Sequence, residues 1–180
     1  MEMTLRLSPR PLLAPFASAF LLACPVLAQA PQAHPDDMIL ARKAVMNQAE
    51  FNLGQLEAAV KAGEAQDLGP LTEKAFNIAV LIQALPHLFG PETNYLGQPN
   101  ADAAVETAAD SKIWDEFDAF YAKAGEVTAA AQAAASVTDA AALAKSVADI
   151  RNACESCHSN YIVYQPFGAA LGMSLEPADD

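Results

Sequence analysis

The chain has 180 residues, of which 53% are apolar and 18% are charged, and its net charge is −12 at pH 7. This length suits one folded domain with a substantial apolar core. Because nucleic acids and anionic membrane surfaces are also negatively charged, we expect neither of them as a partner.

Residues 1–30 have the pattern of a secretory signal peptide. A basic start is followed by an apolar run that is short for a membrane span, and then by Ala28-Gln29-Ala30. We expect cleavage after Ala30 and a periplasmic product that comprises residues 31–180. In a second interpretation, the residues before Cys24 resemble a lipobox, and Cys24 becomes a lipid-anchored N-terminus.

Apolar residues recur with a helical period in four segments of the mature chain, and no segment has the alternating pattern of a strand. The connection over roughly 86–110 is long and rich in turn-forming residues. Four amphipathic segments with these connections predict an all-α fold, an antiparallel four-helix bundle. The expected helices cover roughly 36–63, 70–85, 111–135 and 138–164.

The first of these helices carries two unusual residues on its inward stripe. Arg42 lies among apolar positions such as Ile39 and Leu53. A buried guanidinium is costly unless it is paired, so Arg42 either meets an anion inside the fold or extends to the rim of the bundle. Met46, one turn later, is by residue type a core side chain, unless a bound group takes a ligand from this helix.

The last helix contains the segment 154–158, Cys-Glu-Ser-Cys-His, which is the signature of c-type haem attachment. Residues three and four apart share a helix face, so both thiols and the imidazole can meet one flat macrocycle. Cys154 and Cys157 then form thioether bonds to the haem, and His158 binds the iron. Once Cys24 is removed, no other cysteine is left to pair with them, and thioether bonds remove two thiols that an oxidising periplasm would not leave free.

Two other interpretations of this motif are weaker. A redox-active dithiol normally lies in a βαβ context, which this chain lacks. A zinc site would need His34 or His87, which lie far from the motif in the sequence. For His87 itself a surface position is expected, and for Trp114 a place in the core or against the haem.

With these residues in view, the chain resembles the cytochrome c′ family of class II c-type cytochromes over residues 36–164. The resemblance implies an antiparallel four-helix bundle, often a homodimer, with one covalently attached haem c. Cys154 and Cys157 would be its attachment points and His158 the proximal ligand. Arg42 matches the arginine near the haem propionates, and Thr93 aligns close to the haem. The matching segments are Arg42-Lys43-Ala44-Val45-Met46, Leu85-Pro86-His87-Leu88-Phe89-Gly90, Ile113-Trp114 and the C-terminal haem motif.

Met46 falls at the position that divides this family. In its low-spin members a methionine here ligates the iron, and the protein transfers electrons; a thioether ligand favours Fe(II). In its high-spin members the sixth site is open and binds nitric oxide or carbon monoxide. Met38, near the start of the first helix, and Met173, in the tail, are less well placed.

We therefore rank a periplasmic electron carrier first, with His158 and Met46 as axial ligands and redox proteins as partners. A gas-binding cytochrome, five-coordinate on His158, ranks second, and a haem-free dithiol module third. No nucleophile or acid–base pair accompanies the motif, so we do not expect an enzyme. The segment after His158 lacks the basic residues common in the family, so it departs from the usual partner surface.

Overall fold

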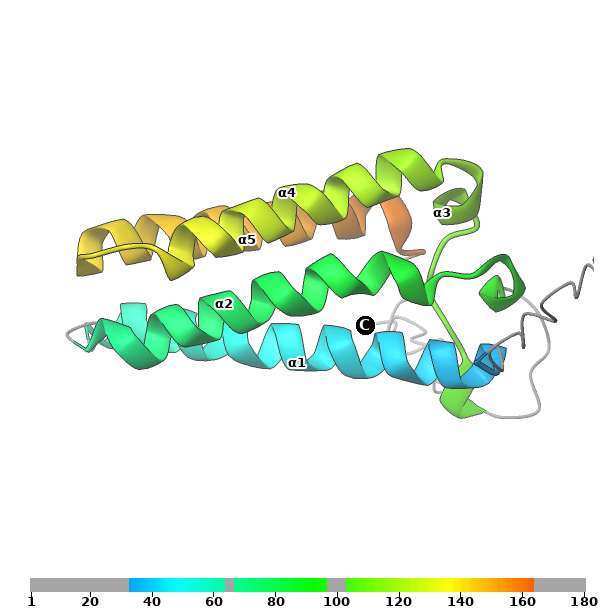
Figure 1. Ribbon diagram of the computed structural model, residues 1–180, viewed down its shortest axis with the longest axis horizontal. Coiled ribbons are helices and arrows are strands. Elements are labelled where there is room, and N and C mark those ends of the chain that lie inside the picture. Colours follow the sequence, from blue (N-terminus) through cyan, green and yellow to red (C-terminus); the bar gives the residue numbers. More distant parts are fainter. Residues whose placement is uncertain (1–32, 64–66, 97–102, 164–180) are drawn as a thin grey trace, which may run out of the picture. The chain divides into compact units, whose positions relative to one another are not determined.

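The computed structural model describes residues 33–63, 67–96 and 103–163. Its four long helices form an antiparallel four-helix bundle (Figure 1), which confirms the predicted fold class. Short helices form the connection between the second and third of them. The long helices are α1 (Pro35–Ala62), α2 (Leu68–Ala84), α4 (Phe117–Ala135) and α5 (Ala140–Tyr161), and the short ones are η1 (Leu85–Leu88), η2 (Pro91–Thr93), η3 (Ala103–Val105) and α3 (Lys112–Asp115).

The signal peptide predicted over residues 1–30, with Cys24, lies outside the described residues, as do Met173 and the rest of the tail. None of the described helices is both long enough and apolar enough to cross a membrane.

Helix α1 begins one residue before the expected start near residue 36, and the N-cap position lies directly before it. His34 takes that place, and its Nδ1 accepts a hydrogen bond from the Asp36 backbone N–H at 3.3 Å. The helix begins at Pro35 because the first turn needs no N–H donor at that position and the proline ring presets a helical φ. The helix stops at Gly63, whose φ of +70° is left-handed and available to glycine at low cost.

The connection into the third long helix also departs from the expected single helix over 111–135. Glu116, with φ −125° and ψ 43°, separates the one-turn α3 from α4. The chain before this break is tied to the end of α5. Asp110 donates its backbone N–H to the Tyr161 carbonyl at 2.9 Å, and Val163 donates to the Ala108 carbonyl at 2.8 Å. These bonds fix the long connection beside the haem motif.

The same bonds end α5 at Tyr161, before the expected limit of 164. Ile162 is extended and forms an isolated antiparallel bridge with Ala109. At its other end α5 is capped by Asp139, whose carboxylate accepts from the Ala142 backbone N–H at 2.8 Å. The last two turns of α5 therefore face the connection on one side and the bundle interior on the other.

The bundle interior is built from the apolar stripes of all four long helices. Each helix packs against two neighbours: α2 lies between α1 and α4, and α5 closes the ring between α4 and α1. Leu53, Ile78, Ala131, Leu143 and Ile150 are among the fully buried side chains. Burial of such side chains is the main favourable contribution to the stability of the bundle.

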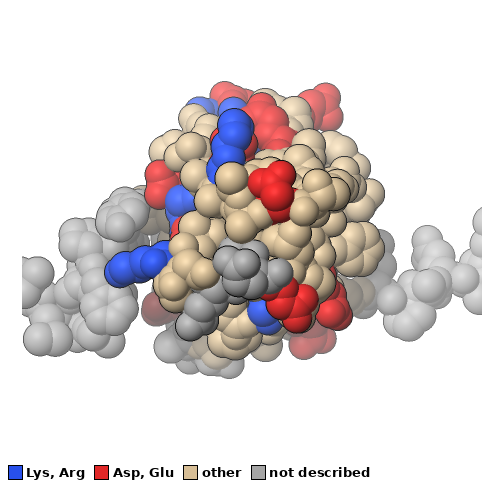
Figure 2. Space-filling model, turned by 90° about the vertical axis from the view of Figure 1, so that its left-hand side faces the viewer, with Lys and Arg blue, Asp and Glu red and all other residues tan. Residues whose placement is uncertain are grey.

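Apart from the buried Arg42, the described charged side chains lie on or near the surface of the bundle and are mixed in sign at one end. Figure 2 looks onto the end at which α1 stops and α5 begins, and acidic and basic side chains lie among one another there. On α5, Lys145 and Asp149 form an ion pair one turn apart, with 2.6 Å between Nζ and Oδ2. The net acidity of the chain is therefore not gathered into one patch on this face.

Candidate functional site

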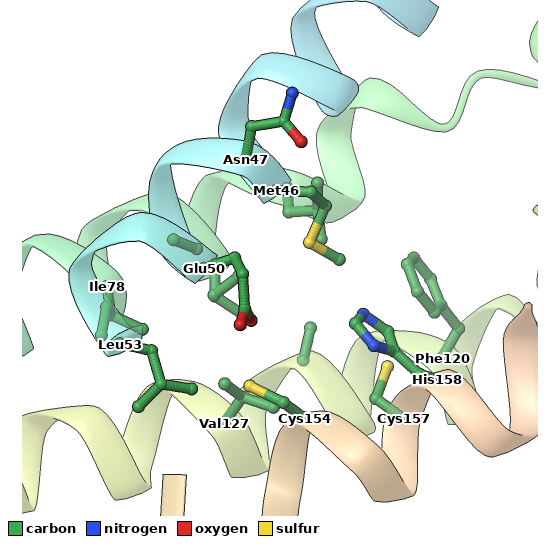
Figure 3. Close-up of a pocket in the computed structure, with 14 residues that line it drawn as sticks. Met46, Asn47, Glu50, Leu53, Ile78, Phe120, Val127, Cys154, Cys157 and His158 are labelled. Atoms are coloured by element: carbon green, nitrogen blue, oxygen red, sulfur yellow. The ribbon is translucent and has the colours of Figure 1, made fainter. Parts of the chain in front are cut away.

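The haem motif lies in the last two turns of α5, close to the connection. Cys157 is buried, with 7% of its surface exposed, Cys154 is partly buried, and both thiols are free. The three-residue spacing puts both sulfurs on one side of the helix, as the sequence predicted. Figure 3 shows Cys154, Cys157 and His158 reaching into the same space.

Two neighbouring cavities open onto this motif. The inner cavity, of about 230 Å³, is lined by residues of all four long helices, including Leu53, Ile78 and Val127. The loop-side cavity, of about 430 Å³, is lined by residues of α1, α4 and α5 and by Thr107–Ala109 of the connection. Both include Cys157 and His158 in their walls. Together they give the motif a mostly apolar space of the size class in which ligands bind.

Met46 faces this space from a neighbouring helix. It lies on α1, is partly buried, and lines both cavities together with His158 (Figure 3). Of the described residues in the two walls, Met46 is the only methionine. Met38 lines neither cavity. The structure thus brings the two predicted axial positions, which are 112 positions apart in the sequence, to one space.

Arg42 is buried, with 4% of its surface exposed, so it does not extend to the rim of the bundle. Its guanidinium donates to Thr93 Oγ1 at 3.1 Å and to Thr107 Oγ1 at 2.9 Å, and it lies 4.6 Å from the centre of the Phe89 ring. No carboxylate is among its described hydrogen-bond partners. Arg42 also lines the loop-side cavity. It is a buried cation without a described counter-ion at the wall of an apolar space.

Burial lowers the pKa of Arg42 to about 10, so the guanidinium is still charged at neutral pH. An anionic group in the loop-side cavity would complete the environment of this charge, and a haem propionate is such a group. Thr93, which the resemblance put near the haem, is fully buried beneath Arg42 and lines neither cavity. It therefore supports Arg42 and does not itself face the cavity space.

The two thiols and the imidazole of the motif favour their neutral forms. Burial raises the pKa of both thiols, to about 11 for Cys157. Burial also lowers the pKa of His158, with the Glu50 carboxylate acting in the opposite direction. A neutral imidazole is the form that binds a metal. The apolar surroundings thus disfavour charge on all three side chains.

The aromatic residues of the resemblance motifs anchor the connection. Trp114 donates its indole N–H to the Gly90 carbonyl at 2.9 Å and packs on Phe89, whose ring centre is 5.8 Å away. His87 is exposed and meets the Tyr121 ring edge to face. Trp114 therefore holds η1 and η2 against the bundle, where Phe89 can contact Arg42.

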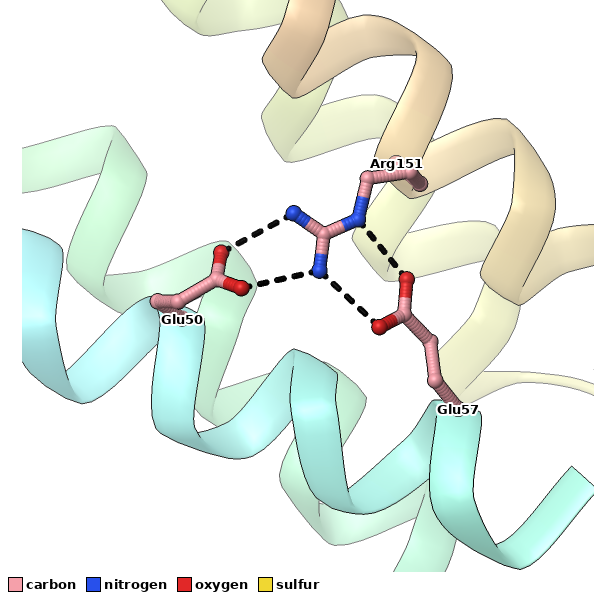
Figure 4. Close-up of polar contacts among 3 residues, drawn as sticks. All are labelled: Glu50, Glu57 and Arg151. Atoms are coloured by element: carbon pink, nitrogen blue, oxygen red, sulfur yellow. Dashed lines mark hydrogen bonds and ion pairs between the residues drawn. The ribbon is translucent and has the colours of Figure 1, made fainter. Parts of the chain in front are cut away.

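Sequence reasoning missed one charged contact beside the site. Arg151 of α5 lies between Glu50 and Glu57 of α1 and bonds to both carboxylates (Figure 4). Glu50 also lines the inner cavity. The sequence held one indication of a shared partner, because two glutamates seven residues apart lie on the same face of a helix. Their partner on a distant helix could not be read from that spacing.

These residues fit a covalently attached haem. The spacing of the thiols, the imidazole beside them, the apolar space and the buried cation at its edge all match what a haem with two propionates requires. The described residues hold no group of three or more His, Cys, Asp or Glu side chains that could bind a metal ion by themselves.

Comparisons with known proteins give the same answer. The family model described as Cytochrome C' matches residues 37–161. Cytochrome c-554 of Cereibacter sphaeroides is 32% identical over 155 residues, which cover 84% of this chain and 97% of the relative.

Two solved structures share the fold. A cytochrome c′ with an unusual ligand-controlled dimer dissociation is 23% identical and has a TM-score of 0.65. A ferrous variant of Alcaligenes xylosoxidans cytochrome c′ with bound NO is 20% identical and has a TM-score of 0.61. Each match covers 74% of this chain and all of the other.

Proposed function

This chain belongs to the cytochrome c′ family, whose members carry one covalently attached haem c, and we propose that it binds a small diatomic gas, nitric oxide or carbon monoxide, beside that haem. We assign Cys154 and Cys157 as the attachment points, His158 as the proximal ligand and Arg42 as the partner of a propionate. A haem held by one proximal histidine supplies an iron site on its other face. We assign that side to Met46, which lines both cavities together with His158.

The observation that carries this proposal is the apolar character of the space around Met46 and His158. Hydrocarbon side chains such as Leu53, Ile78 and Phe120 supply no group that binds iron. Next to these hydrocarbon side chains a neutral ligand is favoured over a charged one, because desolvating an ion is costly. The bound NO of the Alcaligenes xylosoxidans neighbour supports the same choice of ligand class.

Electron transfer, which the sequence ranked first, is the second candidate. One observation favours it: Met46 is the described methionine that shares both cavity walls with His158. A thioether bound to the iron would favour Fe(II) and close the site to gases. Redox proteins would then be the partners. Both candidates are binding or carrier functions, and we propose no enzymatic activity.

An optical spectrum of the purified ferrous protein, with and without carbon monoxide, distinguishes gas binding from electron transfer. The gas-binding proposal expects a broad high-spin spectrum that shifts when the gas is added. A sharp low-spin spectrum that ignores carbon monoxide would replace it with electron transfer. If no haem absorbs after export with the haem-attachment machinery, both candidates fail and the dithiol alternative is left.

Substitution of Met46 separates the candidates a second time. Met46→Leu keeps the volume and removes the sulfur. If Met46 only packs over the site, this variant keeps the spin state and binds carbon monoxide with an affinity close to that of the wild type. If Met46 is a ligand, the variant changes from low to high spin. Met38→Leu is the matched control, since Met38 is on the same helix and lines neither cavity.

We also propose a periplasmic location and a homodimer. The location follows from the signal peptide expected over residues 1–30 and from the attachment of haem c outside the cytoplasm. The dimer is supported by large apolar side chains left exposed, such as Phe76 and Val80 one turn apart on α2. It is also supported by the dimeric neighbour with ligand-controlled dissociation.

Sedimentation at several concentrations tests the dimer. The wild type is expected to sediment as a dimer, and Phe76→Glu is expected to weaken association, because it would bury a charge at the contact. A wild type that remains monomeric at high concentration would contradict the proposal.

A further inference from the structure

Three charged side chains join α1 to α5 beside the inner cavity, and we call them the charge clamp: Glu50, Glu57 and Arg151 (Figure 4). Arg151 Nη1 and Nη2 donate to the two carboxylate oxygens of Glu50 at 3.1 and 2.9 Å. Arg151 Nε and Nη2 donate to those of Glu57 at 2.7 and 2.9 Å. Both contacts are bidentate, which is the strongest and most directional form of this pair.

The two carboxylates differ in their place relative to the site. Glu50 is one turn beyond Met46 on α1 and lines the inner cavity together with Cys154 and His158 (Figure 3). Glu57 is two turns further along the helix and lines neither cavity, and the same is true of Arg151. The clamp therefore holds one of its two carboxylates at the wall of the haem space.

Arg151 keeps its positive charge at neutral pH. The carboxylates raise the pKa of Arg151 above its already high ordinary value, mainly through the hydrogen bonds that Arg151 donates to Glu57 and then to Glu50. Two carboxylates and one guanidinium leave one net negative charge. Arg151 is 29% exposed, so its bonds form at a partly dehydrated seam between the helices. Charges there act more strongly than charges in open water.

We propose that Glu50 is a residue by which this protein sets the reduction potential of its haem, and that Arg151 is a positioning residue that holds the Glu50 carboxylate at the cavity and offsets its charge. A negative charge at the edge of the haem space favours the more positive ferric state and lowers the potential. The guanidinium acts in the opposite sense. This inference rests on the haem of the proposed function, but not on which sixth ligand the iron has.

Potentiometric titration of three haem-loaded variants tests the idea. Glu50→Gln removes the carboxylate charge at the cavity, so its midpoint potential should rise. Arg151→Gln removes the offsetting cation, so its potential should fall. Glu57→Gln is the matched control, because it also removes one negative charge and one bidentate contact with Arg151, but away from the cavity. Its potential should therefore shift less than that of Glu50→Gln.

The opposite signs distinguish electrostatics from structure. If the clamp only held the helices together, Glu50→Gln and Arg151→Gln would loosen the same contact and move the potential in the same direction. That result, or equal shifts for Glu50→Gln and Glu57→Gln, would overturn the proposal. Each variant's ferrous spectrum must match that of the wild type, which shows that the ligands of the iron are unchanged.

The dependence of the potential on salt is a second test of the Glu50 charge. Glu50 is 59% exposed, so dissolved ions reach it and screen its charge. The potential of the wild type should rise with ionic strength, and that of Glu50→Gln should rise less. Identical salt dependences would count against a role for Glu50.

Failure of this inference is distinguishable from failure of the proposed function. Haem content and the response of the ferrous spectrum to carbon monoxide, measured on the same samples, report on the proposed function. If the wild type carries haem and responds to the gas, but Glu50→Gln has the same potential as the wild type, only the role of the clamp is overturned.

Discussion

Replacement of Thr93 by valine tests the buried polar contacts beneath the cavity. The Thr93 hydroxyl accepts from Arg42 at 3.1 Å and donates to the Gly90 carbonyl at 2.8 Å, and the residue has 0% of its surface exposed. Valine has nearly the same shape, so Thr93→Val removes these two hydrogen bonds without opening a cavity. The Gly90 carbonyl keeps its bond from Trp114.

The expected cost follows from the charge of Arg42. A hydrogen bond to a charged group contributes about 1.5–3 kcal/mol and a neutral one about 1 kcal/mol. Arg42 keeps its bond to Thr107 and a weaker one of 3.4 Å to the Thr93 carbonyl, which lessens the loss. We therefore expect the free energy of unfolding to fall by about 2–3 kcal/mol.

Denaturant unfolding of the haem-loaded protein, followed by far-UV circular dichroism, measures this quantity. Thr72→Val is the control, because that hydroxyl bonds only to carbonyls of its own helix turn, and we expect a change under about 0.5 kcal/mol. In an Arg42→Met background the cost of Thr93→Val should fall to about 1 kcal/mol, since only the bond to Gly90 is then lost. An unchanged cost in that background would refute the reasoning.

Three further predictions concern the core, a helix end and the thiols. Leu53→Ala removes a side chain that is 1% exposed and enlarges the inner cavity, so unfolding should become easier by about 2–5 kcal/mol in the same assay; a loss below about 1 kcal/mol would mean that the cavity collapses. Gly63→Ala places a Cβ at φ +70° and should lower the free energy of unfolding by about 1 kcal/mol. Gly54→Ala, within α1 and with open space around it, should raise it by about 0.5–1 kcal/mol. Equal effects of the two substitutions would contradict the assigned backbone conformations. In the haem-free chain, burial raises the pKa of Cys157 to about 11, so the stabilising effect of its buried neutral thiol is complete below its ordinary value of 9.0 and is lost as the pH rises through 11. Iodoacetamide should therefore alkylate this thiol more slowly at pH 8 than it alkylates free cysteine, and equal rates would count against its burial.

The parts of this protein that the sequence predicted are those in which all the information lies within a few turns of one helix. The haem motif needs two thiols and an imidazole on one face, and the spacing of residues 154–158 supplies that by itself. The four apolar stripes likewise predict four helices and their inward faces. The N-cap at His34 and the break at Glu116 were not predicted, because these depend on how the neighbouring turns pack.

Only the tertiary structure decided the contacts between distant segments. It buried Arg42 against Thr93, 51 positions away, where the sequence allowed either burial or exposure at the rim. It also joined Arg151 to Glu50 across 101 positions and so put a carboxylate at the haem space. Helical periodicity reports which face of a helix turns inward, but not which residue of another helix it meets. That depends on how the helices are aligned along the bundle, and only the packed fold settles it.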